Sequence, residues 1–128
     1  MGKKIALACP CGKGLYADCC EPLHRGSPAP TAEALMRSRY SAYVLKLSAY
    51  VVDTWHRDTR PAELLLEDDT TRWLSLDVRQ CSQQDDSATV EFVARYKING
   101  RACRLHEISR FVCQEKRWQY FDGNLIEQ

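Results

Sequence analysis

The stretch that decides the fold is residues 90–113, VEFVARYKINGRACRLHEISRFVC. Apolar and polar residues alternate on both sides of Asn99-Gly100, as they do along strands with one buried face. Asn-Gly is the strongest short signal for a two-residue hairpin turn, because both turn residues must adopt positive φ. The turn therefore predicts two long antiparallel strands, and its length sets the cross-strand pairs: Ile98 with Arg101, Tyr96 with Cys103, Ala94 with Leu105, and Phe92 with Glu107.

The rest of the second half predicts further strands of the same sheet. Residues 74–78 alternate between apolar and polar, which predicts a strand with three residues on its buried face: Leu74, Leu76 and Val78. Glu115-Lys116 marks another turn, before the last predicted strand at residues 118–122. These strands form an antiparallel meander.

A long helix is predicted before the sheet. Thr31 is the expected N-cap, and the helix is expected to run from about Ala32 to about Trp55. Residues that are mostly apolar recur there at helical spacing and define one face: Met36, Tyr40, Tyr43, Leu47, Tyr50 or Val51, and Thr54. The basic residues of the segment are expected to lie off that face: Arg37, Arg39 and Lys46. A short helix is also predicted at residues 62–66, and the whole pattern is that of an α+β fold.

Four of the seven cysteines lie within twelve residues, in the segment CPCGKGLYADCC at positions 9–20. Core packing does not need neighbouring cysteines, so the two explanations are a metal site or disulfides. No credible export signal precedes the segment, because its apolar run, residues 5–8, is shorter than such a signal needs. Thiols stay free in a reducing cytoplasm, and a close cysteine cluster there more often binds metal. We therefore expect one structural Zn²⁺ in a closed tetrahedral shell: Cys9, Cys11, Cys19 and Cys20.

Composition restricts the partners and the compartment. The formal net charge is +1, which provides no general attraction to nucleic acids or to membrane surfaces. No apolar run approaches the length of a membrane span. We expect a cytoplasmic protein that is not associated with a membrane, and nothing in the sequence indicates a nucleic-acid partner.

The cysteine segment resembles the SEC-C motif, a short zinc-binding module named for the C-terminus of the SecA translocase. That motif reads Cys-x-Cys-Gly-x-Gly, an aromatic residue, and then Cys-Cys or Cys-His, and the spacer of this chain is one residue shorter. Four more segments resemble the YchJ-like (UPF0225) bacterial proteins: residues 35–43, 54–56, 106–111 and 118–123. The resemblance implies an SEC-C-like zinc module at residues 1–28 and an NTF2-like (cystatin-like) domain at residues 29–128. In such a domain a long helix packs on a curved antiparallel sheet and forms a cone.

The hairpin register places one carboxylate on an apolar face. Glu107 shares that face with Phe92 and Leu105, and the face is expected to lie against the helix. A buried isolated charge is costly, so Glu107 must be neutral, paired with an arginine or a tyrosine hydroxyl, or next to water in a cavity. It is the candidate polar centre of a pocket with three aromatic lining residues: Tyr40, Tyr43 and Trp118. The simpler explanation is a structural hydrogen bond for Glu107 and core packing for the tyrosines.

The three histidines have simple explanations. His24 is close enough to replace one cysteine as a ligand, but four thiolates complete the shell, so His24 is expected to face solvent. His106 falls on the outer face of the hairpin by alternation and is also expected to face solvent. His56 follows the predicted long helix, where it can cap the last carbonyls or lie at a pocket mouth.

Two classes of function remain. The first is an adaptor that uses the zinc knuckle as a docking surface for a protein partner, which the resemblance to the translocase module supports. The second is a small-molecule-binding protein or acid–base enzyme that uses the cone, with Glu107 as its polar centre. The sequence favours the adaptor and assigns no catalytic residue. The inner face of the cone discriminates the two classes, because convergent polar groups around an open cavity indicate a ligand site.

Overall fold

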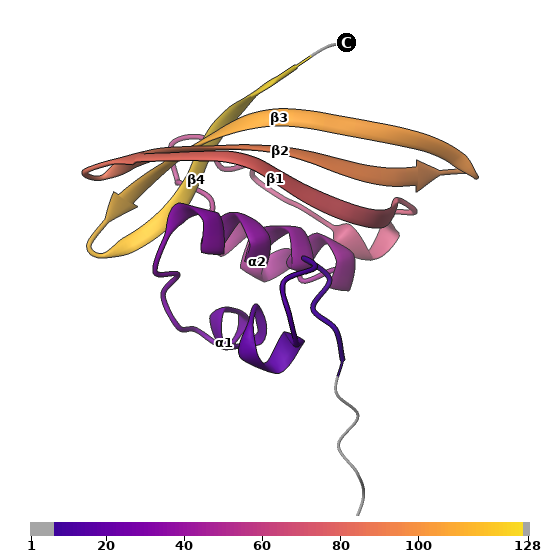
Figure 1. Cartoon of the computed structure of the whole chain (residues 1–128), viewed down its shortest axis with the longest axis horizontal. Coiled ribbons are helices and arrows are strands. Elements are labelled where there is room, and N and C mark those ends of the chain that lie inside the picture. The colour runs from indigo at the N-terminus through magenta and orange to yellow at the C-terminus, as the bar shows by residue number, and fades with distance from the viewer. Residues whose placement is uncertain (1–6, 127–128) are drawn as a thin grey trace, which may run out of the picture.

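The computed structural model describes residues 7–126 and shows three layers stacked on one another (Figure 1). A curved sheet lies on one side, helix α2 (Ala32–Leu45) packs beneath it, and the N-terminal segment with α1 (Glu21–His24) lies beneath α2. The predicted α+β class is confirmed. Residues 1–6 and 127–128 lie outside the described residues, and the prediction about an export signal depends largely on them.

The sheet is an antiparallel meander in the order β1-β2-β3-β4. Its strands are β1 (Arg72–Gln84), β2 (Ser87–Ile98), β3 (Arg101–Gln114) and β4 (Arg117–Leu125). The predicted hairpin register is confirmed at every pair, including Phe92 with Glu107. Asn99 and Gly100 both have positive φ, 51° and 78°, as the turn requires. The turn at Glu115-Lys116 is also confirmed, with Gln114 paired to Arg117 across it.

Strand β1 differs from its prediction at one end. A bulge between Trp73 and Ser75 shifts the pairing, so that Trp73 lies opposite Tyr96 and packs toward the core. Leu74 is left 47% exposed, and its predicted place on the buried face is wrong. Leu76 and Val78 do pack against the core.

The predicted long helix is two helices, α2 and α3 (Ser48–Asp53), because the chain turns sharply at Lys46. Lys46 adopts the left-handed conformation with φ 60°, and the Leu47 amide donates to the Ala42 carbonyl at 2.8 Å. The N-cap at Thr31 is confirmed, since its hydroxyl accepts from the Ala34 amide at 3.0 Å. The turn brings α3 back against α2.

The predicted short helix at residues 62–66 is wrong. Residues 62–65 form no helix, and a 3₁₀ helix begins only at Leu66 and runs over Leu66–Asp68. Leu66 is buried and its amide donates to the Ser48 hydroxyl at 2.9 Å. This anchor attaches the loop to the start of α3, and the acidic residues after it stay at the surface.

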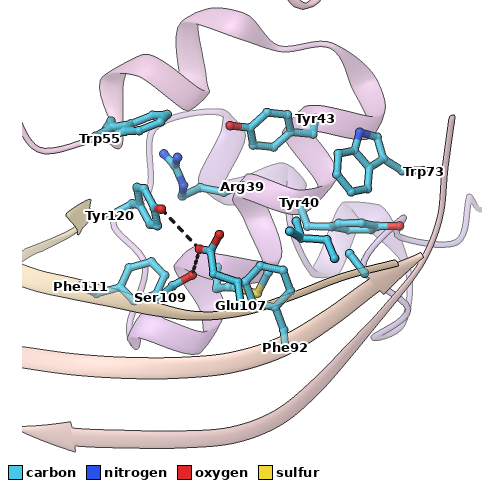
Figure 2. A pocket seen from close by; sticks show the side chains of 13 residues that line it. Arg39, Tyr40, Tyr43, Trp55, Trp73, Phe92, Glu107, Ser109, Phe111 and Tyr120 are labelled. Atoms are coloured by element: carbon cyan, nitrogen blue, oxygen red, sulfur yellow. Dashed lines mark hydrogen bonds between the residues drawn. The ribbon is translucent and has the colours of Figure 1, made fainter. Parts of the chain in front are cut away.

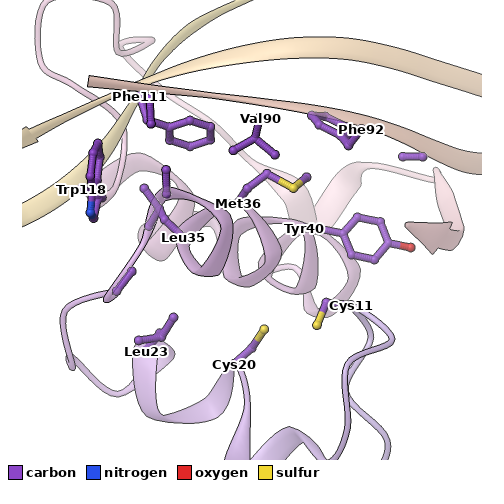
Figure 3. Close-up of a cluster of buried hydrophobic side chains, with 14 of the residues drawn as sticks. Cys11, Cys20, Leu23, Leu35, Met36, Tyr40, Val90, Phe92, Phe111 and Trp118 are labelled. Carbon is purple, nitrogen blue, oxygen red and sulfur yellow. The ribbon is translucent and has the colours of Figure 1, made fainter. Parts of the chain in front are cut away.

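One hydrophobic core passes through all three layers (Figure 3). Phe92 and Phe111 contribute from the sheet, Leu35 and Met36 from α2, and Leu23 from the N-terminal segment. Helix α2 is therefore covered by protein on two sides rather than one. Within residues 7–126, no helix combines the length and apolar character that crossing a membrane requires.

Candidate functional site

A tight loop builds the first half of the cysteine cluster. Ala8 and Leu15 form an antiparallel bridge, and the Cys9 amide donates to the Gly14 carbonyl at 2.8 Å. Gly12 and Gly14 have φ of 87° and 101°, a conformation that residues with a Cβ rarely adopt. The loop places Cys9 and Cys11 opposite the second cysteine pair.

All four predicted ligands converge. The sulfur atoms of Cys9, Cys11, Cys19 and Cys20 lie within 4.8 Å of one another, and no other such group of His, Cys, Asp or Glu occurs in residues 7–126. A tetrahedron with Zn–S bonds of about 2.3 Å has sulfur–sulfur edges of about 3.8 Å. The Cys11–Cys19 and Cys19–Cys20 sulfur distances are 3.5 and 3.9 Å, so the donor set fits zinc. The shorter spacer does not prevent this convergence.

The cysteines of the cluster are free thiols, and the contact between two of them shifts their pKa values in opposite directions. All seven cysteines are unpaired thiols. Hydrogen bonding with Cys20 lowers the pKa of Cys11 to about 4, and the same contact with Cys11 raises the pKa of Cys20. The Cys11 sulfur therefore carries negative charge most readily, while Cys20 keeps a proton that a bound cation would displace.

Two residues of α2 contact the cluster, and sequence reasoning did not identify them as part of the site. The Ser41 hydroxyl is fully buried, contacts the Cys9 sulfur at 3.5 Å and donates to the Cys20 sulfur at 3.3 Å. Arg37 donates to the Cys11 carbonyl at 3.1 Å. Both contacts fix the orientation of ligand residues, as outer-shell groups do in metal sites. The sequence signal was the small polar pair Ser38 and Ser41, spaced to face one side of a helix.

His24 attaches the N-terminal segment to α2 and does not face solvent, so its predicted exposure is wrong. Its Nδ1 accepts from the Tyr16 hydroxyl at 2.7 Å, and its Nε2–H donates to the Ser38 carbonyl at 2.8 Å. The ring packs edge-on against Tyr50 at 4.7 Å. Burial lowers the pKa of His24, which favours the neutral ring that these two bonds require.

A cavity of about 310 Å³ lies between α2 and the inner face of the sheet. Most of its wall is aromatic or aliphatic: Met36, Tyr40, Tyr43, Trp55, Trp73, Phe92, Ala94, Leu105, Phe111 and Tyr120. Three further lining residues are polar: Arg39, Glu107 and Ser109. Figure 2 shows these polar groups pointing into one region of the cavity, from α2 and β3.

Glu107 is held from one side of this polar region. Its Oε2 accepts hydrogen bonds from the Ser109 hydroxyl and, at 3.3 Å, from the Tyr120 hydroxyl. Gly123 lies behind it, and a Cβ at that position would be 2.4 Å from Oε2. Burial and the negative charge of Glu107 raise the pKa of Tyr120, which keeps this hydroxyl a donor.

Arg39 lies inside the cavity wall, so its predicted position off the buried face is wrong. It is only 5% exposed, and its Nη1 donates to the Val51 carbonyl and the Thr54 hydroxyl, both at 2.7 Å. The guanidinium stacks over Trp55 at 5.2 Å and Tyr120 at 4.7 Å. Its acceptors lie in α3 and at the C-cap of α3, which reach Arg39 only because the chain turns at Lys46.

The remaining predictions divide as follows. Tyr40, Tyr43 and Glu107 all line the cavity. Trp118 does not line the cavity. It pairs with Cys113 close to the turn of the β3–β4 hairpin and is buried in the core.

The other two histidines are also more enclosed than expected. His56 is buried beside β4, where its amide donates to the Tyr120 carbonyl, and it does not line the cavity. His106 is half-buried with its Nε2 bonded to Glu91 at 2.7 Å, so its predicted exposure is wrong.

The fold and the site together define an NTF2-like protein with an SEC-C motif packed against its helix. The family model described as "YchJ, middle NTF2-like domain" matches residues 31–123. The chain belongs to this YchJ-like UPF0225 family. A UPF0225 protein of Bordetella parapertussis is 55% identical over 123 residues, which cover 92% of each chain. A UPF0225 protein of Cupriavidus metallidurans is 55% identical over 127 residues, 93% of this chain and 89% of that one.

Two solved structures share the whole arrangement. The solution structure of RPA3114, an SEC-C motif containing protein from Rhodopseudomonas palustris, matches with a TM-score of 0.84 and 36% identity, over 94% of this chain and 100% of that one. The crystal structure of an SEC-C motif containing protein from Psychrobacter arcticus matches with a TM-score of 0.73 and 32% identity, over 94% of this chain and 84% of that one. The similarity therefore extends over the cysteine segment and the cone together.

Proposed function

We propose that this protein binds a small molecule in the cavity of its cone, on a scaffold that one zinc ion stabilises. The observation that carries the proposal is the convergence of three polar side chains inside an otherwise apolar cavity: buried Arg39 and Ser109, and half-buried Glu107. Ligand sites are apolar hollows of about 300–1,000 Å³ with a few placed polar groups, and this cavity is at the small end of that range. An open, polar-centred cone favours the ligand-binding class over the adaptor.

Zinc is the structural part of the proposal. The sulfur distances fit a tetrahedral ion, and four protein ligands leave no open position for a substrate. A thiolate metal site needs reduced cysteines, so we propose that the protein works in a reducing compartment, the cytoplasm. Elemental analysis after purification without chelator should give one zinc per chain, and a value near zero would contradict the assignment.

Removal of a ligand tests how the two parts depend on each other. We propose the division at residues 1–28 and 29–128, with the zinc module packed on α2 through Leu23 and His24. Cys11→Ser should abolish stoichiometric zinc and loosen residues before Thr31, while the sheet keeps its amide protection from hydrogen exchange. Equal loss of protection in both parts would contradict the division.

Binding in the cone can be tested with a neutral aromatic probe. Indole should shift the backbone NMR signals of residues around the cavity, those of β3 at residues 105–111 above all. Leu105→Trp is the matched control, because Leu105 is a partly exposed cavity residue and the larger ring would fill the space. Identical shifts in the wild-type and Leu105→Trp proteins would contradict binding in the cavity.

A second candidate function, the adaptor, is supported by one observation on the knuckle. Leu7 and Leu15 are 64% and 45% exposed and lie together, because the Tyr16 amide donates to the Leu7 carbonyl and Ala8 pairs with Leu15. Adjacent exposed apolar side chains are the part of the knuckle that a protein partner could cover. Capture of a specific partner that Leu15→Asp abolishes and Leu105→Trp preserves would support the adaptor; partner capture unaffected by Leu15→Asp would exclude this surface.

A further inference from the structure

The inference starts from the donors that Arg39 keeps free. Its hydrogen bonds to the protein all start at Nη1, and among residues 7–126 neither Nε nor Nη2 has an acceptor. No carboxylate oxygen of the described residues lies within 4.0 Å of this guanidinium. A cation buried to this degree is costly unless an anion or several acceptors compensate it. One carbonyl, one hydroxyl and two aromatic faces compensate only part of the charge.

Glu107 offers the complementary group across the same space. Its Oε2 takes both hydrogen bonds, and Oε1 has no donor among the described residues. The Arg39 and Glu107 side chains line one cavity without forming an ion pair with each other. Figure 2 shows the guanidinium above the carboxylate, with Tyr43 and Tyr120 at the sides. Free donors and a free acceptor therefore line the same cavity.

We propose that the ligand is a small zwitterion of the amino-acid type, with its carboxylate on Arg39 and its ammonium group on Glu107. The planar guanidinium fork matches a carboxylate, and the free Oε1 accepts from an N–H donor. An apolar ligand side chain would lie against the aromatic wall formed by Trp73 and Phe92. This proposal rests on the proposed function, because it names the ligand class of that same cavity.

The charge arrangement disfavours simpler ligands. An acid without an amine would place its carboxylate near the Glu107 carboxylate, and like charges repel strongly in a buried site. An amine without an acid would place its ammonium group near the Arg39 guanidinium, and these two positive charges would also repel each other. A neutral apolar ligand would occupy the space but leave both charges unsatisfied. A zwitterion neutralises both groups.

Three matched probes test this assignment by calorimetry: L-phenylalanine, 3-phenylpropionate, which lacks the amine, and 2-phenylethylamine, which lacks the acid. Phenylalanine should bind about tenfold or more tightly than either of the others, since each of them loses a charge-assisted hydrogen bond. In Glu107→Gln, the affinity for phenylalanine should fall about tenfold. The affinity for 3-phenylpropionate should rise, because the charge that repels its carboxylate is gone. In Arg39→Met, 2-phenylethylamine should instead be the probe that binds more tightly, because the guanidinium that repels its ammonium group is gone.

The outcomes separate this inference from the proposed function. Equal affinities for the three probes, unchanged in Glu107→Gln, would overturn the zwitterion while indole binding still supported a ligand cavity. Tightest binding of 3-phenylpropionate would also overturn it. If neither indole nor any of the three probes binds the wild-type protein, the proposed function fails as well. Because Arg39→Met removes buried contacts, Glu107→Gln provides a test that does not depend on how that variant folds.

Discussion

Ser41→Ala is the sharpest test of how the cysteine cluster would hold the proposed zinc ion. The Ser41 hydroxyl is fully buried and contacts two sulfurs, those of Cys9 and Cys20, at 3.5 and 3.3 Å. A hydrogen bond to a charged group is worth about 1.5–3 kcal/mol, and loss of an outer-shell partner lowers metal affinity about 10–100-fold. Since tenfold corresponds to about 1.4 kcal/mol, the two ranges agree. We therefore expect zinc affinity to fall about 10–100-fold in Ser41→Ala.

The matched control is Ser38→Ala, one turn earlier on the same helix. Ser38 is equally buried, but its hydroxyl bonds the Leu35 carbonyl and the Tyr50 hydroxyl and contacts no sulfur. Competition against a colorimetric zinc chelator gives the affinity of each variant. Ser38→Ala should lose stability without losing zinc affinity. Equal affinities in the two variants would refute the role assigned to Ser41.

Three further predictions follow from single features. Lys46→Gly should raise the free energy of unfolding by about 0.5–1 kcal/mol in a urea titration, because Lys46 has a positive φ that glycine adopts without strain. A lower free energy of unfolding in the variant would contradict this. Gly123→Ala should displace the Glu107 carboxylate, which a Cβ would approach to 2.4 Å, and should weaken phenylalanine binding in calorimetry about tenfold. Because burial lowers the pKa of His24 below 6.5, its stabilising contribution is present above about pH 6.5 and is lost as the pH falls below that value. His24→Gln should flatten that part of the stability–pH curve measured with saturating zinc; an unchanged slope would contradict it.

The parts that sequence reasoning predicted correctly depend on short-range rules. Asn99-Gly100 sets a two-residue turn, and the strand pairing over the whole hairpin follows from it. The position of Glu107 opposite Phe92 is a consequence of that register. The cysteine cluster is local as well, since Cys9 and Cys20 are close enough in sequence for a glycine-containing loop to bring their sulfurs together.

The parts that were wrong depend on contacts distant in sequence. Lys46 ends α2 without a glycine or proline, because α3 gains contacts with α2 and with the Leu66 loop that exceed the local strain. Arg39 is buried because α2 has protein on two sides and because the turn delivers the Val51 carbonyl to it. Helical periodicity assumes one buried face, so it could not identify Arg39 as the second polar centre of the cavity.

The most direct test of a zinc-stabilised ligand cone is a native mass spectrum of the wild-type and Leu105→Trp proteins, purified side by side without chelator. Both should carry the mass of one zinc ion, which dissociates on acid denaturation. Only the wild type should also carry a small molecule, or take one up when phenylalanine is added. Zinc-free spectra, or equal small-molecule uptake by the two proteins, would contradict the assignment of the cysteine cluster or of the cavity, respectively.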